Sequence, residues 1–216
     1  EFPFTREEFD KKIEKTKVAI QGFGNVGRFT AAVCYEFGMK VVAISDITGM
    51  ISNKNGLDIP ELLKYKTIAE VPNHELEPAE DLFKTNCDIL IPAALGGVIK
   101  EDNYHLLNTQ FIIEGANQPI TSEADRELRV NGVTIVPDIL ANSGGVMGSY
   151  FEWTQNIQQF SWDIEKFRKE LDSRMRKAFN TVRKTSEKYG VDYRSAAYIL
   201  AVSRVSEAFA SRGSLV

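Results

Sequence analysis

The stretch GFGNVG, residues 22–27, has the GxGxxG spacing that brings a backbone loop close to a phosphate. An apolar run precedes it, a helical pattern follows, and Asp46 stands 19 residues beyond Gly27. Gly22 would permit a tight turn, Gly24 would let a pyrophosphate approach the backbone, and Gly27 would let the helix pack against its strand. The combination predicts a dinucleotide-binding loop, and a bare turn between strand and helix is the alternative.

Asp46, with Ile47 beside it, stands where the second strand is expected to end. A carboxylate at this point can accept both ribose hydroxyls of an adenosine, and it would repel a 2′-phosphate. No Lys or Arg follows it until Lys54. We therefore expect NAD rather than NADP as the cofactor. An Asp that starts a turn before Thr48-Gly49 is the alternative, and it is compatible with the binding role.

Short apolar, β-branched runs alternate with helical patterns up to residue 138, as in a parallel sheet that is covered on both faces. The segment 46–56 is rich in turn residues, and the chain beyond residue 138 has helical periodicity. We expect strands at 17–21, 40–45, 87–92, 111–115 and 133–138, and helices at 6–15, 25–37, 58–65, 122–131, 143–159, 161–189 and 194–210.

This order of elements predicts the α/β class, as a doubly wound, Rossmann-like dinucleotide-binding domain with a helical C-terminal extension. A capping box, Thr5-x-x-Glu8, begins the first helix. No repeat or linker splits the rest of the chain. We therefore divide it into a helical lead-in, residues 1–16, and one domain, residues 17–216.

The composition excludes several function classes. The chain has 43% hydrophobic residues and a net charge of −4, so it has no basic surface for nucleic acid. No apolar run is long enough to span a bilayer or to form a signal core, so we expect no membrane contact and a cytoplasmic location. Cys34 and Cys87 lack CxxC spacing, and His74 and His105 match no metal motif. We expect two buried thiols and no metal.

Seven ordered stretches are similar to the nucleotide-binding half of the glutamate dehydrogenases, within the wider family that acts on Glu, Leu, Phe and Val. The similarity covers nearly the whole chain from Lys17. The stretch SYFEWTQNIQQFSW resembles the glutamate enzymes more than the branched-chain or aromatic ones. In chain order the seven stretches are VAIQGFGNVG, VVAISD, ILIPAAL, IEGAN, VPDILANSGGV, SYFEWTQN and YRSAAYILAVSRV.

The resemblance implies a role for each matching residue. Asn25 and Val26 would cap the pyrophosphate, Asn117 would lie near the nicotinamide ribose, and Asn142 would hold the carboxamide. Both of the last two Asn residues also suit ordinary turns. All these positions follow predicted strands, and open α/β sheets bind ligands at that edge. The residues expected to contact the cofactor are Gly22, Phe23, Gly24, Asn25, Val26, Gly27, Asp46, Ile47, Ala93, Ala94, Asn117 and Asn142.

Ser149 matches a serine that contacts the side-chain carboxylate of the substrate in the glutamate enzymes, and Val146 lies one turn earlier on the same face. A hydroxyl cannot neutralise a carboxylate, so such a substrate also needs a cationic partner. An ordinary small polar residue in a helix is the alternative. Two residues depart from the family: Gln118 stands where glycine is frequent, and Gly97 stands where a polar residue is common.

The family carries its catalytic lysine and aspartate in a separate N-terminal domain, which nothing in this chain resembles. We therefore expect no catalytic residue and no turnover in this chain alone, whether it is a cut domain or a standalone protein. For the complete enzyme the resemblance implies a homo-oligomer that reversibly deaminates L-glutamate to 2-oxoglutarate and ammonia. The alternatives are the same domain of a leucine- or phenylalanine-type dehydrogenase, a non-catalytic NAD-binding protein, and an interaction module without a ligand.

Overall fold

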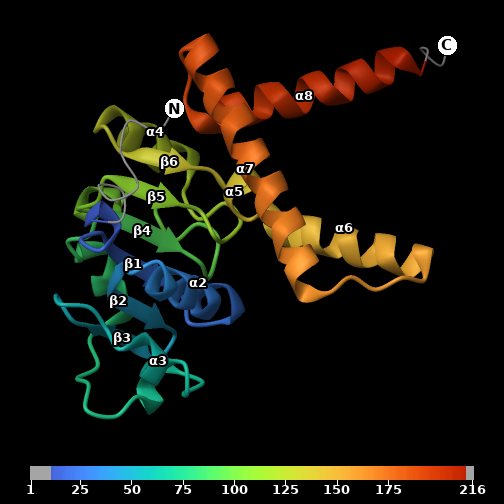
Figure 1. The fold of residues 1–216 in the computed structure, drawn as a ribbon. Helices are drawn as coiled ribbons and strands as arrows, with labels where there is room; N and C mark the ends of the chain where they lie inside the picture. The colour runs from blue at the N-terminus through green and yellow to red at the C-terminus, as the bar shows by residue number, and fades with distance from the viewer. Residues whose placement is uncertain (1–10, 213–216) are drawn as a thin grey trace. The chain divides into compact units, whose positions relative to one another are not determined.

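The computed structural model describes residues 11–212, which form two compact units. The first unit ends at Thr134 and contains most of the sheet, and the second begins at Ile135 and is mainly helical (Figure 1). The helix predicted at 6–15 lies partly outside the described residues. In its described part, residues 11–13 are helical. No helix in the described range is both long enough and apolar enough to cross a lipid bilayer.

The six-stranded sheet has the order β3-β2-β1-β4-β5-β6. The central strand β1 pairs in parallel with β2 on one side and with β4 on the other, and β4 pairs in parallel with β5. The chain therefore changes direction across the sheet between β1 and β4, which creates the switch point where α/β folds bind ligands. The strands are β1 (Lys17–Gln21), β2 (Lys40–Asp46), β3 (Gly49–Ser52), β4 (Ile89–Pro92), β5 (Phe111–Ile113) and β6 (Thr134–Val136).

The edge strand β3 lies within the turn-rich segment 46–56, where no strand was predicted from the sequence. Ile47 and Thr48 form a two-residue turn, after which β3 runs antiparallel to β2 with Asp46 opposite Gly49. The sheet is thus mixed rather than purely parallel. Met50 of this strand is buried. Four residues are too few to display the alternation by which a strand is identified in a sequence.

The helices of the first unit begin at or next to the predicted residues, and α2 and α4 end within one residue of the prediction, but the helix predicted at 58–65 ends at Leu62. Gly38, with a φ of +79°, follows the end of the first of them, α2. The side chain of Asp58 accepts a hydrogen bond from the Glu61 N–H, and that of Thr121 accepts one from the Ala124 N–H. The helices are α2 (Asn25–Glu36), α3 (Ile59–Leu62) and α4 (Ser122–Val130), with short 3-10 helices η1 (Ile68–Glu70), η2 (Ala79–Lys84) and η3 (Tyr104–Leu106).

The helix α2 forms as its apolar periodicity predicts, but the apolar stripe is not its buried face. Phe29 and Phe37 are 73% and 57% exposed. The buried residues of the helix are Gly27, Ala31 and Cys34. These side chains are small, so the helix axis can lie close to the sheet.

The core of the first unit is formed largely by its central strands, in which Val18, Ile20 and Ile44 are completely buried. Cys34 and Cys87 are free and buried, as predicted. Burial raises the pKa of each thiol to about 11. Both thiols are therefore protonated at neutral pH and protected from reagents in solution.

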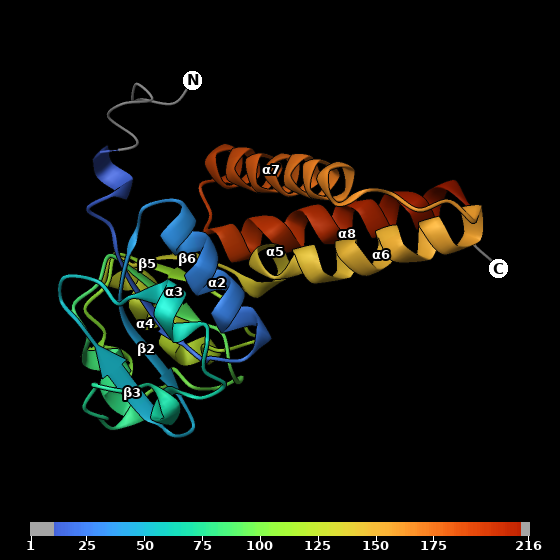
Figure 2. The ribbon, with the colours of Figure 1, turned by 60° about the horizontal axis from the view of Figure 1, so that its bottom comes forward.

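The second unit contains three long helices, α6, α7 and α8, which Figure 2 shows together. Asp163 and Asp192 cap α7 and α8 by accepting hydrogen bonds from backbone N–H groups, and Gly190 ends α7 in the left-handed conformation. These ends agree with the predicted helices to within three residues. The helices are α5 (Asp138–Ala141), α6 (Ser143–Gln158), α7 (Ile164–Tyr189) and α8 (Tyr193–Ser211).

A small core holds α5, α7 and α8 together. Leu140 from α5 and Val182 from α7 pack with Ala196 and Ala197 at the start of α8. A separate cluster of aromatic side chains surrounds Phe151 of α6, which is 1% exposed. The second unit therefore buries few large side chains for its length.

Candidate functional site

A groove of about 860 Å³ lies in the first unit, where β1, β2 and β4 end. Its size is within the range of small-molecule and cofactor sites. The ends of parallel strands at a switch point are the usual position of such sites. Nine of the residues predicted to contact a cofactor line it: Gly22, Phe23, Gly24, Asn25, Val26, Asp46, Ile47, Ala93 and Ala94.

Two glycines of the loop after β1 are required by close packing. Gly22 has a φ of +107°, and a Cβ atom there would lie 2.8 Å from the Ala93 carbonyl oxygen. A Cβ atom on Gly27 would lie 1.9 Å from the Gly22 carbonyl oxygen. Real Cβ atoms do not approach backbone oxygens so closely, so both positions exclude a side chain. The turn and the close approach of α2 predicted from these glycines are present.

Gly24 differs from its neighbours because nothing lies within 4 Å of the position that its Cβ atom would occupy. It is the N-cap residue of α2, and no side chain caps the N–H groups of the first helical turn. The space and the uncapped helix end face the same groove. An anion that approaches here meets backbone donors and the positive end of the helix dipole.

Asp46 ends β2 and lines the groove, but its carboxylate also bonds extensively to the protein. Its Oδ1 atom accepts hydrogen bonds from the Thr48 N–H at 2.7 Å and from the Thr48 hydroxyl at 2.5 Å. Its Oδ2 atom accepts one from the Ile68 N–H at 2.9 Å. The carboxylate is therefore held in a fixed orientation between the turn after β2 and the helix η1.

Apolar groups contribute to the groove in two different ways. Ile47 is 98% exposed and Val26 is 50% exposed, so both can be covered by a flat ligand ring. Phe23 is only 4% exposed and packs in the core, so it supports the loop from below. The Arg28 guanidinium lies 4.6 Å from the centroid of the Phe23 ring.

The structure also brings two lysines to the groove that the sequence analysis did not select. Lys66 and Lys100 line it together with Asp46 and Glu80. The segment before Lys66 is held by Arg28, whose guanidinium donates to the carbonyl oxygens of Leu63 and Tyr65. Lys66 stands 20 residues after Asp46 in the sequence, and no local spacing relates the two. Only the return of the chain to the end of β2 places them in one groove.

A second loop pair borders the groove, formed by the segments that follow β4 and β5. The Gly97 N–H donates to the Gln118 carbonyl oxygen at 2.8 Å, and a Cβ atom on Gly96 would lie 2.9 Å from the Asn117 carbonyl oxygen. Gln118 has a φ of +45°, in the left-handed region that favours glycine. A left-handed backbone at this position is a physical reason for the glycine that the resemblance implies there. Asn117 lies beside the groove without lining it.

The other predicted ligand residues lie on the second unit. Asn142 precedes α6 directly, and Val146 and Ser149 follow at intervals of four and three residues, so all three share one face of the helix. Val146 is 78% exposed. The Ser149 hydroxyl donates to the Gly145 carbonyl oxygen at 3.3 Å. This face is open to a ligand, and the roles of the three residues stay predictions.

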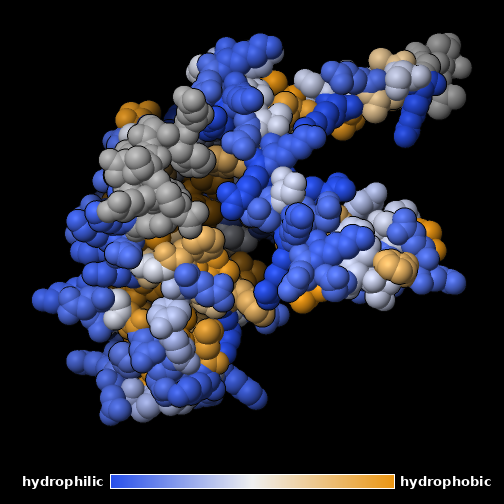
Figure 3. Space-filling model, viewed as in Figure 1, coloured by the Kyte–Doolittle hydropathy of each residue, from blue (hydrophilic) through white to orange (hydrophobic). Residues whose placement is uncertain are grey.

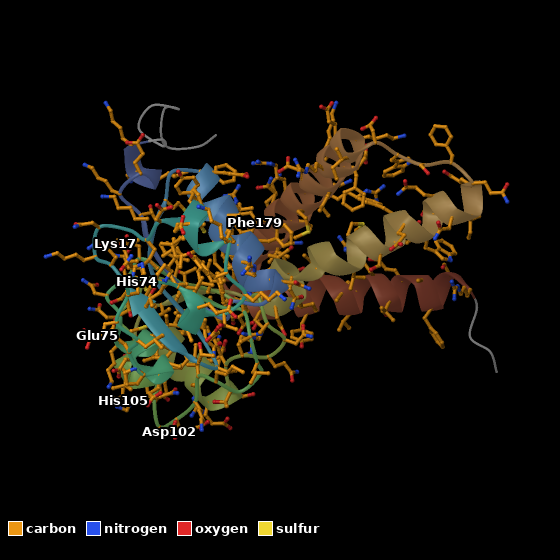
Figure 4. The ribbon with its side chains drawn as sticks, turned by 90° about the horizontal axis from the view of Figure 1, so that it is seen from below. Lys17, His74, Glu75, Asp102, His105 and Phe179 are labelled. Carbon is orange, nitrogen blue, oxygen red and sulfur yellow. The ribbon has the colours of Figure 1, made fainter. Side chains whose placement is uncertain are left out.

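Neither histidine takes part in a site. His74 and His105, both labelled in Figure 4, are exposed side chains of the first unit. Within residues 11–212, no group of three or more His, Cys, Asp or Glu side chains is placed to hold a metal ion.

A family model described as Glutamate/Leucine/Phenylalanine/Valine dehydrogenase matches residues 4–213 of the chain. The chain belongs to this family. A curated relative, the glutamate dehydrogenase of Thermotoga maritima, is 49% identical over 205 residues, which are 93% of this chain and 49% of the relative. The chain thus spans about half the length of this curated relative. Enzymes of the family are oxidoreductases that act on amino acids.

Solved structures of glutamate dehydrogenases have the same fold over half of their length. The hetero-hexameric enzyme of Thermus thermophilus, in its leucine-bound form, has a TM-score of 0.87 and 31% identity, and the match covers 97% of this chain and 51% of that one. The enzyme of Peptoniphilus asaccharolyticus has a TM-score of 0.78 and 34% identity, with coverage of 95% and 50%. The resemblance and the Rossmann-like α/β fold class predicted from the sequence are confirmed.

Proposed function

We propose that this chain is the nucleotide-binding part of a glutamate dehydrogenase and that it binds NAD in the groove at the ends of β1, β2 and β4. The observation that carries this proposal is the contrast between the glycines of the loop. Packing against the protein explains the lack of side chains at Gly22 and Gly27. It does not explain Gly24, where a side chain would meet only the open groove. A pyrophosphate against the backbone accounts for the third glycine.

For the complete enzyme we infer the reversible oxidative deamination of L-glutamate to 2-oxoglutarate and ammonia. A nicotinamide cofactor, when bound, supplies the acceptor for the hydrogen removed from the substrate carbon. The support is the 49% identity with a glutamate dehydrogenase, of which this chain covers half. We assign Asn142 to the carboxamide of the cofactor, and Val146 and Ser149 to the substrate. A homo-oligomer of complete chains belongs to the same proposal.

The primary test is calorimetric titration of the chain with NAD and then with NADP, with glutamate oxidation assayed on the same sample. We expect binding of NAD without turnover, because the relatives that act on glutamate are about twice as long as the matched region. Turnover by this chain would refute the assignment of the catalytic groups to the other half of the enzyme. Binding of neither cofactor would refute the role of the groove.

Substitution of Gly24 by Val tests the loop directly. The new side chain would occupy the space that we assign to the pyrophosphate, and it would meet no protein atom. We expect NAD binding to fall below detection by calorimetry while the thermal unfolding temperature stays within about 2 °C of the parent. Binding equal to that of the parent would mean that the glycines serve only the turn.

The preference for NAD rests on Asp46, whereas Lys66 offers a positive charge in the same groove. We expect Asp46→Ser to lower NAD affinity about tenfold, because a hydrogen bond to a charged acceptor is lost. Discrimination against NADP should narrow in the same variant, since a 2′-phosphate would no longer meet a carboxylate. Titration with both cofactors measures both effects. Unchanged affinities for the two would remove Asp46 from the site.

A further inference from the structure

The carboxylate of Asp46 already accepts three hydrogen bonds from the protein. A carboxylate has about four lone-pair positions, two on each oxygen. Three protein donors bond to Asp46: the N–H and the hydroxyl of Thr48 on Oδ1, and the Ile68 N–H on Oδ2. One position is left, and it is on Oδ2.

Thr48 supplies both hydrogen bonds that Oδ1 accepts. Its hydroxyl donates to that oxygen and accepts a hydrogen bond from the Ala69 N–H at 3.1 Å. The hydroxyl has one hydrogen, which it donates to Asp46, while one of its two lone pairs accepts the bond from η1. The same hydroxyl therefore connects the turn after β2 to η1 and fills the second lone pair of Oδ1.

From these contacts we propose that the Oδ2 atom of Asp46 accepts a hydrogen bond from only one hydroxyl of the adenosine ribose. Thr48 is the positioning residue, because its two hydrogen bonds to Oδ1 leave that oxygen unable to accept one from the second ribose hydroxyl. The proposal rests on the binding of NAD in the groove. It departs from the expectation that this carboxylate accepts both ribose hydroxyls. It also gives Thr48 a part in cofactor selection, although Thr48 is exposed at a turn and matches no motif.

The test uses NAD and two analogues that lack either the 2′- or the 3′-hydroxyl of the adenosine ribose. Each is titrated calorimetrically into the parent and into Asp46→Ser. The loss of affinity that disappears in Asp46→Ser is the part that depends on the carboxylate. For one analogue we expect a carboxylate-dependent loss of affinity of about tenfold. For the other analogue we expect no carboxylate-dependent loss of affinity.

Two substitutions at Thr48 separate its hydroxyl from its backbone. Thr48→Val removes the hydroxyl and keeps the N–H, so Oδ1 gains a free position, and both analogues should then lose affinity through Asp46. Thr48→Ser keeps the hydroxyl and should behave as the parent. Thermal unfolding of both variants reports any loss of the link to η1, and this readout does not depend on the analogue used.

Carboxylate-dependent losses for both analogues in the parent, or for neither, would overturn the single-hydroxyl assignment. A loss confined to one analogue in Thr48→Val would overturn the part given to Thr48. Absence of NAD binding by the parent would refute the proposed function itself, and this is seen before any analogue is used. The failure of each proposal thus has its own signature.

Discussion

The two units differ in the burial of their large apolar side chains, which are mostly buried in the strands of the first unit and often exposed on the helices of the second. In the first unit the strands bury Val18, Ile20 and Ile44 completely, and the groove lies where β1, β2 and β4 end. In the second unit, α6 and α8 leave apolar side chains exposed at alternating intervals of three and four residues, and apolar patches are visible along both helices in Figure 3. These residues are Val146, Tyr150, Trp153 and Ile157 on α6, and Tyr198, Val202, Val205 and Phe209 on α8.

This difference separates two ways in which a sequence can specify structure. A buried strand is specified by the neighbours that it packs against, so its apolar run and its core agree. The long helices are specified locally, by caps such as Asp163 and Asp192 and by the stop at Gly190. Such helices form without covering their apolar faces. An exposed apolar face of this kind marks a surface that associates with other molecules.

The two units carry separate reporters, which makes the comparison measurable. Both cysteines, Cys34 and Cys87, lie in the first unit, and both tryptophans, Trp153 and Trp162, lie in the second. Burial raises the pKa of each thiol to about 11, so at pH 8 the native thiols should react only when the first unit opens. Thiol labelling and tryptophan fluorescence can therefore follow the two units in one urea titration.

The largest effect is expected for Gly27→Val. The new Cβ atom would overlap the Gly22 carbonyl oxygen, and neither backbone segment can yield without moving α2 from the sheet. We expect a loss of more than about 4 kcal/mol, seen as immediate thiol labelling without urea. The tryptophan transition should change far less. Gly24→Val is the matched control, because the same side chain there meets no protein atom.

A pair of leucine truncations compares the two cores. Leu90 of β4 is 2% exposed and Leu140 of α5 is 5% exposed. We expect Leu90→Ala to destabilise the first unit by about 4 kcal/mol, and Leu140→Ala to destabilise the second by about 2 kcal/mol, because the smaller core can collapse around the cavity. Thiol labelling should report the loss of stability in the first unit, and tryptophan fluorescence should report the loss in the second. Equal shifts of both reporters by either variant would show that the two units unfold as one.

The smallest effect on stability is expected at the exposed face of α8. Val205 is 71% exposed, so Val205→Glu should change the free energy of unfolding by no more than about 0.5 kcal/mol. It should nevertheless reduce self-association, since a charge is placed in the apolar stripe. Sedimentation velocity over a concentration series measures this effect. Ser203→Glu adds the same charge on the other side of the helix and should leave self-association unchanged.

The sequence predicts the local features of this protein well, because they depend on neighbours along the chain. The loop of residues 22–27, the caps of the helices and most strand positions agree with the structure. The strand β3 was missed because it has only four residues and follows β2 after a turn of only two residues. The buried face of α2 differs from its apolar stripe, since close contact with the sheet requires small side chains there.

Family, fold class and the place of the groove are thus determined by residues close together in sequence, whose spacing has a direct physical meaning. The tertiary structure alone decided which distant groups share that groove. Lys66 reaches it through a segment that Arg28 holds, and Asp46 is bonded by Ile68, which is 22 residues away. Such contacts depend on where the chain returns in space. A spacing rule along the sequence carries no information about that return.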